Sequence, residues 1–215
     1  MFIKYRMTTN PFTVGPRVSI PDAAGLMDAH GVRHLPVVDE GVVVGVISRN
    51  DIAAALPSQA TTLSAAEATY LVSKLKVHRV MSKPALTISS QALLEEAAVI
   101  MRDKKIEMLP VVDDGQLVGV ITESDILDSF IDILGFREHG CRLTVEARDE
   151  PGVLEQLTGI TAAHHANITH LAVHRGNGGY STVVVGVNTL NTEEIEADLA
   201  AAGMRVVAKL TNVHK

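Results

Sequence analysis

Apolar residues occur in short runs separated by polar turns, and one such pattern appears twice with the same spacing. The run Leu35–Val38 is followed by Asp39-Glu40-Gly41 and a second run up to Ile47, and this order returns 74 residues later from Leu109. Positions 34–56 and 108–130 share 12 of 23 residues without a gap. Apolar runs around an Asp/Gly turn predict a β-hairpin. The duplication predicts two similar units, each carrying its own copy of any site.

The segments around each hairpin predict a strand and two helices. Helical spacing occurs among Ala23, Ala24 and Met27 in the first copy, and among the corresponding Ala97, Ala98 and Met101 in the second. Ser19 with Asp22 predicts an N-cap, and Gly31 predicts the helix end. A closing helix is expected to start near Asn50 or Ser124, after the hairpin. Between the copies, residues 57–62 read as a loop, and the capping box Ser64/Glu67 predicts a helix through Leu75.

The pattern changes after residue 138. Leu143–Arg148 alternates as a strand, and Asp149-Glu150-Pro151-Gly152 breaks it before an expected helix over Val153–His165. Further elements are expected as follows: strands at 167–173 and 181–187 around the Gly-rich turn 176–179, a helix opened by Asn191 and Glu194 and ended by Gly203, and a last strand at 205–210. This β-α-β-β-α-β order is ferredoxin-like. We therefore predict a mixed α/β (α+β) chain with units at 1–60 and 77–136, an inter-repeat helix within 61–76, and a third domain at 139–215.

Composition narrows the function classes. The chain has 215 residues, 47% of them hydrophobic, a net charge of −6 and no Trp. Acidic charge and few aromatics argue against nucleic-acid binding, and no apolar run is long enough to cross a bilayer, so we expect a cytoplasmic protein without nucleic-acid or membrane partners. The lone Cys141 is expected to be buried. His164, His165, His170 and His174 are interpreted as surface imidazoles, because residues four apart on a strand lie about 13 Å apart, too far to share a metal ion.

The doubled motif Leu-Pro-Val-Val-Asp, turn, Gly-Val-Ile-Ser/Thr-x-x-Asp resembles the CBS domain, and its tandem arrangement resembles a Bateman module. The resemblance implies two clefts that bind adenine nucleotides without performing chemistry on them. An Asp at a helix start can accept hydrogen bonds from both ribose hydroxyls, and a neighbouring Ser or Thr can reach phosphate. By resemblance, the first nucleotide site comprises Thr13, Val14, Arg33, His34, Leu35, Pro36, Ser48 and Asp51, and the second Thr87, Ile88, Leu109, Pro110, Thr122 and Asp125.

The two expected sites differ in charge. Arg33, His34 and Arg49 of the first copy are replaced by Glu107, Met108 and Glu123 in the second. A carboxylate near phosphate costs free energy where an arginine would contribute a charge-assisted pair. We therefore expect the first cleft to be the better nucleotide site. The alternative is that Asp51 and Asp125 serve only as helix caps.

The C-terminal domain resembles the ACT domain, through Asp-Glu-Pro-Gly-Val-Leu at its first strand-to-helix turn and Ala-Asn-Ile at its second strand. The resemblance implies an amino-acid site at Asp149, Gly152, Val153, Asn167 and Ile168. The alternative is that Pro151 and Gly152 only shape the turn and the domain only pairs chains.

A CBS pair followed by an ACT domain resembles the AcuB type of acetoin-utilisation protein. No Walker loop, nucleophile elbow or paired zinc-ligand motif is found, and no cofactor or metal is expected. The resemblance implies a non-catalytic, homodimeric regulator that binds adenine nucleotides (AMP, ADP, ATP or an S-adenosyl compound) and an amino acid. The competing hypothesis is a ligand-independent adaptor that docks on a client metabolic enzyme.

Overall fold

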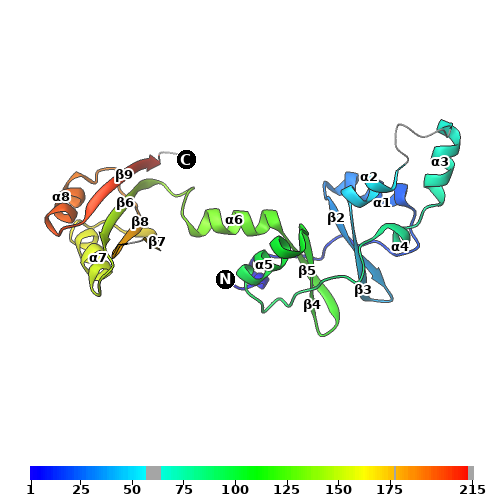
Figure 1. Ribbon diagram of the computed structural model, residues 1–215, viewed down its shortest axis with the longest axis horizontal. Coiled ribbons are helices and arrows are strands. Elements are labelled where there is room, and N and C mark those ends of the chain that lie inside the picture. Colours follow the sequence, from blue (N-terminus) through cyan, green and yellow to red (C-terminus); the bar gives the residue numbers. More distant parts are fainter. Residues whose placement is uncertain (57–63, 177, 213–215) are drawn as a thin grey trace. The chain divides into compact units, whose positions relative to one another are not determined.

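The chain forms two compact units, Met1–Leu127 and Asp128–Lys215, with the boundary inside helix α6 (Figure 1). The computed structural model describes residues 1–56, 64–176 and 178–212, so the predicted loop at 57–62 lies outside the described residues. The first unit contains both repeats and the second contains the ferredoxin-like domain. No helix in the described ranges is both long and apolar enough to span a membrane.

The first unit contains two copies of a helix–hairpin–helix arrangement. Its elements are η1 (Ile3–Tyr5), β1 (Thr8–Thr9), α1 (Ile20–His30), β2 (His34–Asp39), β3 (Val42–Ser48), α2 (Arg49–Ala55), α3 (Ala65–Lys74), α4 (Val77–Val80), α5 (Leu94–Lys104), β4 (Met108–Asp113), β5 (Gln116–Thr122) and α6 (Glu123–Ile133). The predicted cap of Ser19, the left-handed stop at Gly31 and the Ser64/Glu67 capping box are all confirmed.

The two hairpins match in register as well as in sequence. Strands β2 and β3 pair antiparallel with an irregularity after Val37, and β4 and β5 have the same irregularity after Val111. The turns use consecutive positive φ angles at Glu40 and Gly41 and again at Asp114 and Gly115. This conformation fits the right-handed twist of the strands, which is why an acidic residue followed by Gly closes both hairpins.

Each repeat is completed by the segment that precedes the other repeat. Strand β1 pairs with β5 of the second repeat, and Ser82 forms the equivalent bridge to Val46 of the first. Ile3 is fully buried in the second repeat, among side chains that include Leu94, Leu109 and Ile121. The two repeats therefore interlock, and the segments that exchange between them also lead into the candidate site.

The second unit has the predicted β-α-β-β-α-β order. Its elements are β6 (Gly140–Arg148), α7 (Val153–Ala163), β7 (Ile168–Arg175), β8 (Tyr180–Val187), α8 (Glu193–Ala201) and β9 (Arg205–Asn212). The antiparallel sheet has the order β7-β8-β6-β9, and its Leu143 and Val185 are fully buried in one core cluster with Leu199 of α8. Cys141 is buried, as expected. Asn191 does not form a box with Glu194: helix α8 starts at Glu193, whose N–H donates to the Asn191 side chain (3.3 Å).

His170 is buried, so its interpretation as a surface imidazole was wrong. Only 9% of it is exposed, and its ring lies so close to Gly135 and Gly186 that a methyl group at either glycine would overlap it. Its Nε2 atom has no hydrogen-bond partner among the described residues. His164 instead pairs with Asp198 (2.8 Å) and Glu194 (3.4 Å). No group of three metal-ligating side chains occurs in the described part of the chain.

Burial of His170 predicts a loss of stability in mild acid. Burial, aided by Arg142 and opposed by Glu138, lowers the pKa of His170 below its usual 6.5. The unfolded chain then binds more protons than the folded one as pH falls, so this contribution is complete above about pH 6.5 and is lost below it. The free energy of unfolding, measured in urea between about pH 7 and pH 5.5, should fall less steeply for His170→Gln than for the wild type. The control is His174→Gln at an exposed position of the same strand, which should show the same dependence of the free energy of unfolding on pH as the wild type. Equal slopes for all three proteins would refute this role of His170.

Candidate functional site: two crossed cavities

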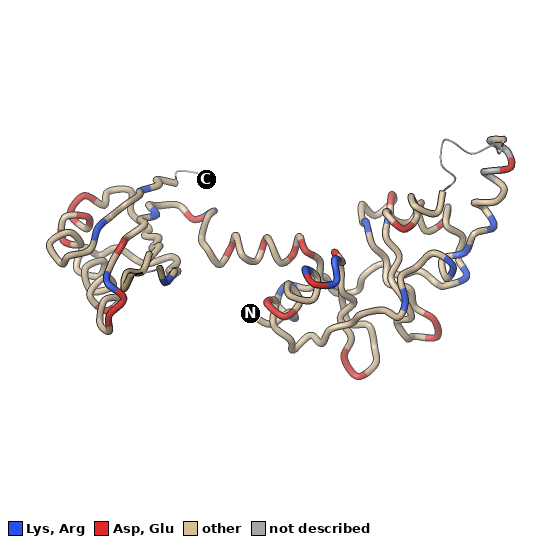
Figure 2. Tube along the Cα trace, in the orientation of Figure 1, with Lys and Arg blue, Asp and Glu red and all other residues tan. Residues whose placement is uncertain are grey.

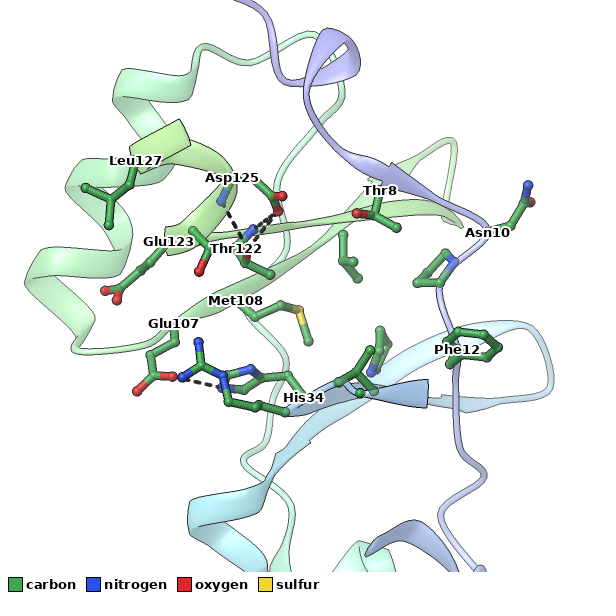
Figure 3. A pocket seen from close by; sticks show the side chains of 17 residues that line it. Thr8, Asn10, Phe12, His34, Glu107, Met108, Thr122, Glu123, Asp125 and Leu127 are labelled. Carbon is green, nitrogen blue, oxygen red and sulfur yellow. Dashed lines mark hydrogen bonds and ion pairs between the residues drawn. The ribbon is translucent and has the colours of Figure 1, made fainter. Parts of the chain in front are cut away.

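Two cavities of the first unit are lined by positions that correspond through the 74-residue repeat. The larger, of about 490 Å³, is lined by Thr8, Asn10, Pro11, Phe12, Gly31, Val32, Arg33, His34, Pro36, Glu107, Met108, Val120, Thr122, Glu123, Ser124, Asp125 and Leu127 (Figure 3). The smaller, of about 280 Å³, is lined by His34, Val46, Ser48, Asn50, Asp51, Ser82, Pro84, Ala85, Leu86, Lys105, Ile106, Glu107 and Met108. We call them the Asp125 cavity and the Asp51 cavity. The volume of the Asp125 cavity falls within the usual range for small-molecule sites.

Both cavities have the same polar motif at the start of a helix. Asp51 Oδ2 accepts hydrogen bonds from the backbone N–H (2.8 Å) and the hydroxyl (2.7 Å) of Ser48. Asp125 Oδ2 accepts the equivalent bonds from Thr122 at the same two distances. The capping role considered as the alternative is therefore real. A carboxylate offers about four lone-pair positions on two oxygens, so capping does not exclude ligand binding.

The cavities are crossed between the repeats, which differs from the expected grouping. Arg33 belongs to the Asp125 cavity and not to the cavity with Ser48 and Asp51. Arg49, expected to strengthen the first cleft, forms an ion pair with Asp28 and lies outside the described lining of both. The crossing arises because the segment before each hairpin faces the motif of the other repeat. The reason for preferring the first cleft is therefore removed, and the Asp125 cavity has both the larger volume and the arginine.

Several expected contact residues are core residues. Val14, Leu35, Ile88 and Leu109 are at most 8% exposed and belong to the two hydrophobic cores. The backbone N–H groups of Val14 and Ile88 donate to Pro36 and Pro110. Pro36 lines the Asp125 cavity, whereas Pro110, Thr13 and Thr87 are not among the described lining residues of either cavity.

Two segments that carry no motif in the sequence, and were not predicted as site residues, line the cavities instead. Thr8 with residues 10–12 lines the Asp125 cavity, and Ser82 with residues 84–86 lines the Asp51 cavity, again at a spacing of 74. Their only sequence signal was their position ahead of each repeat. Phe12 stacks on His30 of α1, with ring centroids 3.6 Å apart, so its ring is held at the edge of the Asp125 cavity.

His34, Glu107 and Met108 line both cavities and so form a shared wall. His34 Nε2 lies 3.5 Å from Glu107 Oε2, which joins β2 of the first repeat to the residue before β4 of the second. Burial lowers the pKa of His34, and this outweighs the opposing effect of Glu107. His34 is therefore uncharged at neutral pH, and the Glu107 carboxylate is not neutralised by it.

The expected amino-acid site of the second unit is only partly brought together. Asp149, Gly152 and Val153 line a hollow at the turn between β6 and α7, together with Val173 and Arg175 among others. Arg175 Nε lies 3.4 Å from Asp149 Oδ2. Asn167 and Ile168 lie outside the described lining, because the Asn167 N–H donates to Asn188 Oδ1 (2.8 Å) and Ile168 packs on the core.

Family models match most of the chain. The CBS domain matches residues 3–58 and 77–132, and the TTHA0829-like ACT domain matches residues 139–209. These matches agree with the duplicated hairpins and with the β-α-β-β-α-β unit. The chain belongs to the CBS domain family, as a tandem CBS pair followed by an ACT domain.

Solved structures similar to the chain cover the CBS pair. A putative acetoin utilization protein (AcuB) from Vibrio cholerae is 32% identical, with a TM-score of 0.52 over 64% of this chain and 96% of that one. The CBS pair of protein MJ0100, solved with 5′-methylthioadenosine and S-adenosyl-L-methionine, is 30% identical, with a TM-score of 0.52 over 60% and 95%. CBSX2, solved with AMP, is 31% identical, with a TM-score of 0.50 over 61% and 97%.

Curated relatives include both CBS proteins and enzymes. The CBS domain-containing protein YhcV of Bacillus subtilis is 33% identical over 58% of this chain and 81% of its own length. Inosine-5′-monophosphate dehydrogenase of Korarchaeum cryptofilum is 31% identical, but the chain spans only 26% of that enzyme's length. The similarity to this enzyme therefore covers only about a quarter of its length and gives no information on catalysis by this chain.

Proposed function

We propose that this protein is a non-catalytic, cytoplasmic regulator that binds an adenosine-containing ligand in its CBS cavities, with the Asp125 cavity as the main site. The observation that carries the proposal is a cavity of about 490 Å³ with Thr122 and Asp125 placed on its wall. Complexes of MJ0100 and CBSX2 with adenosine compounds support it. A homodimer, an amino acid at the β6–α7 turn and a link to acetoin utilisation are further parts of the proposal; the last rests on the Vibrio cholerae relative.

Calorimetry with Asp125→Asn tests the ligand site. The full chain is titrated with 5′-methylthioadenosine, S-adenosylmethionine, AMP, ADP and ATP. Loss of a hydrogen bond to a charged acceptor costs about 1.5–3 kcal/mol, so the affinity for the best ligand should fall by at least about tenfold. Asn keeps a side-chain oxygen near the Thr122 cap, which limits the effect on folding.

Asp22→Asn is the matched control. Asp22 also lies in a first helical turn beside a capping serine, Ser19, and it is outside the described lining of both cavities. Its affinity should equal that of the wild type. No heat with any of the five compounds, together with unchanged melting temperatures, would instead favour the ligand-independent adaptor. In that case helix capping alone would account for Asp51 and Asp125.

A further inference from the structure

The described lining of the Asp125 cavity is acidic. Glu107, Glu123 and Asp125 contribute three carboxylates, and Arg33 contributes one exposed guanidinium. Helix α6, whose first turn supplies Glu123 and Asp125, carries four acidic side chains and no basic one (Figure 2). His34 adds no charge at neutral pH, for the reason given above. A phosphate entering this cavity would therefore meet more negative than positive charge.

The Asp51 cavity has the same excess on a smaller scale. Its described lining carries the carboxylates of Asp51 and Glu107 against the single ammonium of Lys105. Glu107 is the carboxylate that the two cavities have in common. Any charge preference that depends on Glu107 is therefore shared by both sites.

The residues of the Asp125 cavity are arranged along one direction. Thr122 and Asp125 lie between Glu107 and Glu123 on one side and Asn10 and Phe12 on the other (Figure 3). A ribose held by Asp125, beside Thr122, would leave two ends of the ligand to place. Pro11 and Phe12 provide an apolar end that suits a base, and with the base there the 5′ substituent would point towards Glu107 and Glu123.

We infer that both cavities select adenosine ligands with an uncharged or cationic 5′ group, a thioether or a sulfonium, over 5′-phosphates, and that Glu107 is the shared specificity residue. The inference rests on the proposed adenosine site. Repulsion between a carboxylate and a phosphate is strong in a partly buried site, where the effective dielectric constant is well below that of water. A sulfonium gains from the same field, and a thioether is indifferent to it.

Titration of wild type, Glu107→Gln and Glu193→Gln with 5′-methylthioadenosine, S-adenosylmethionine and AMP tests the inference. The wild type should bind 5′-methylthioadenosine at least about tenfold more tightly than AMP. Glu107→Gln should tighten AMP binding about tenfold, weaken S-adenosylmethionine binding and leave 5′-methylthioadenosine within about twofold. Glu193→Gln, on the exposed first turn of α8, removes the same charge far from both motifs in the sequence and should change nothing.

The variant Glu123→Gln distinguishes binding at the two cavities. Glu123 lines the Asp125 cavity and is not among the described lining residues of the Asp51 cavity, so AMP should gain affinity at one site of the two. The inference is overturned if wild-type protein binds AMP as tightly as 5′-methylthioadenosine, or if the ratio of the two affinities is unchanged in Glu107→Gln. Binding of only ADP or ATP would also overturn the inference but would leave the proposed function standing. Absence of binding by all five adenosine compounds refutes the proposed function itself, and the inference with it.

Discussion

Gly140→Ala should destabilise the second unit by about 3 kcal/mol or more. Gly140 begins β6 with φ at 137°, a conformation that residues with a Cβ atom rarely adopt. A methyl group there would also overlap the carbonyl oxygen of Val187, which is backbone in the paired strand β8 and cannot rotate away. The backbone strain and the steric overlap therefore add at one buried position.

Gly159→Ala in α7 is the matched control, because it is the same chemical change in the same unit. No heavy atom lies within 4 Å of the added Cβ, and replacing a mid-helix glycine with alanine should stabilise by about 0.5–1 kcal/mol. Urea unfolding monitored by circular dichroism gives both values, and hydrogen exchange of the β6 amides localises the effect. A Gly140→Ala protein as stable as the Gly159→Ala protein would contradict this account of β6.

The fold could be predicted from the sequence wherever the signal is local. The hairpin around Glu40-Gly41, its copy around Asp114-Gly115 and the capping box at Ser64 are each encoded within a few neighbouring residues, and all are observed. The pairing of β1 with β5 could not be predicted, because it joins residues more than a hundred positions apart, and Thr8–Thr9 has no strand pattern of its own. Burial of His170 was missed for the same reason: the glycines that admit its ring, Gly135 and Gly186, are distant in sequence.

In the candidate site, too, the local motifs could be predicted and the contacts between distant residues could not. The Ser/Thr-x-x-Asp motifs were identified through the resemblance to the CBS domain, because each is a short continuous sequence present in both repeats, and each lies on a cavity wall. Arg33 and Pro36 were grouped with the Asp51 motif but line the Asp125 cavity, whereas His34 lines both cavities. The sequence shows which residues are duplicated but not which copy each of them faces. Each of the two exchanged segments passes close to one glycine of the hairpin that it joins, Thr8 to Gly119 and Ser82 to Gly45.

Gly119→Ala and Gly45→Ala should each impair one cavity and spare the other. A Cβ at Gly119 would lie 2.8 Å from the carbonyl oxygen of Thr8 and 2.9 Å from Met7 Sδ. A Cβ at Gly45 would lie 2.9 Å from the carbonyl oxygen of Ser82 and 2.7 Å from Met81 Sδ. Each substitution forces the exchanged segment away from the hairpin, at a cost of about 1–3 kcal/mol.

The functional consequence follows from what the displaced segments carry. Thr8 begins the segment that lines the Asp125 cavity, and Ser82 begins the one that lines the Asp51 cavity. Calorimetry with the best adenosine ligand should therefore show loss of the stronger site in Gly119→Ala and loss of the weaker site in Gly45→Ala. Gly25→Ala in α1, where a Cβ has no heavy atom within 4 Å, should keep both sites. Equal losses at both sites in the two hairpin variants would contradict this account. In the crossed arrangement, the hairpin with Gly119 positions only the Thr8 segment at the Asp125 cavity, and the hairpin with Gly45 positions only the Ser82 segment at the Asp51 cavity.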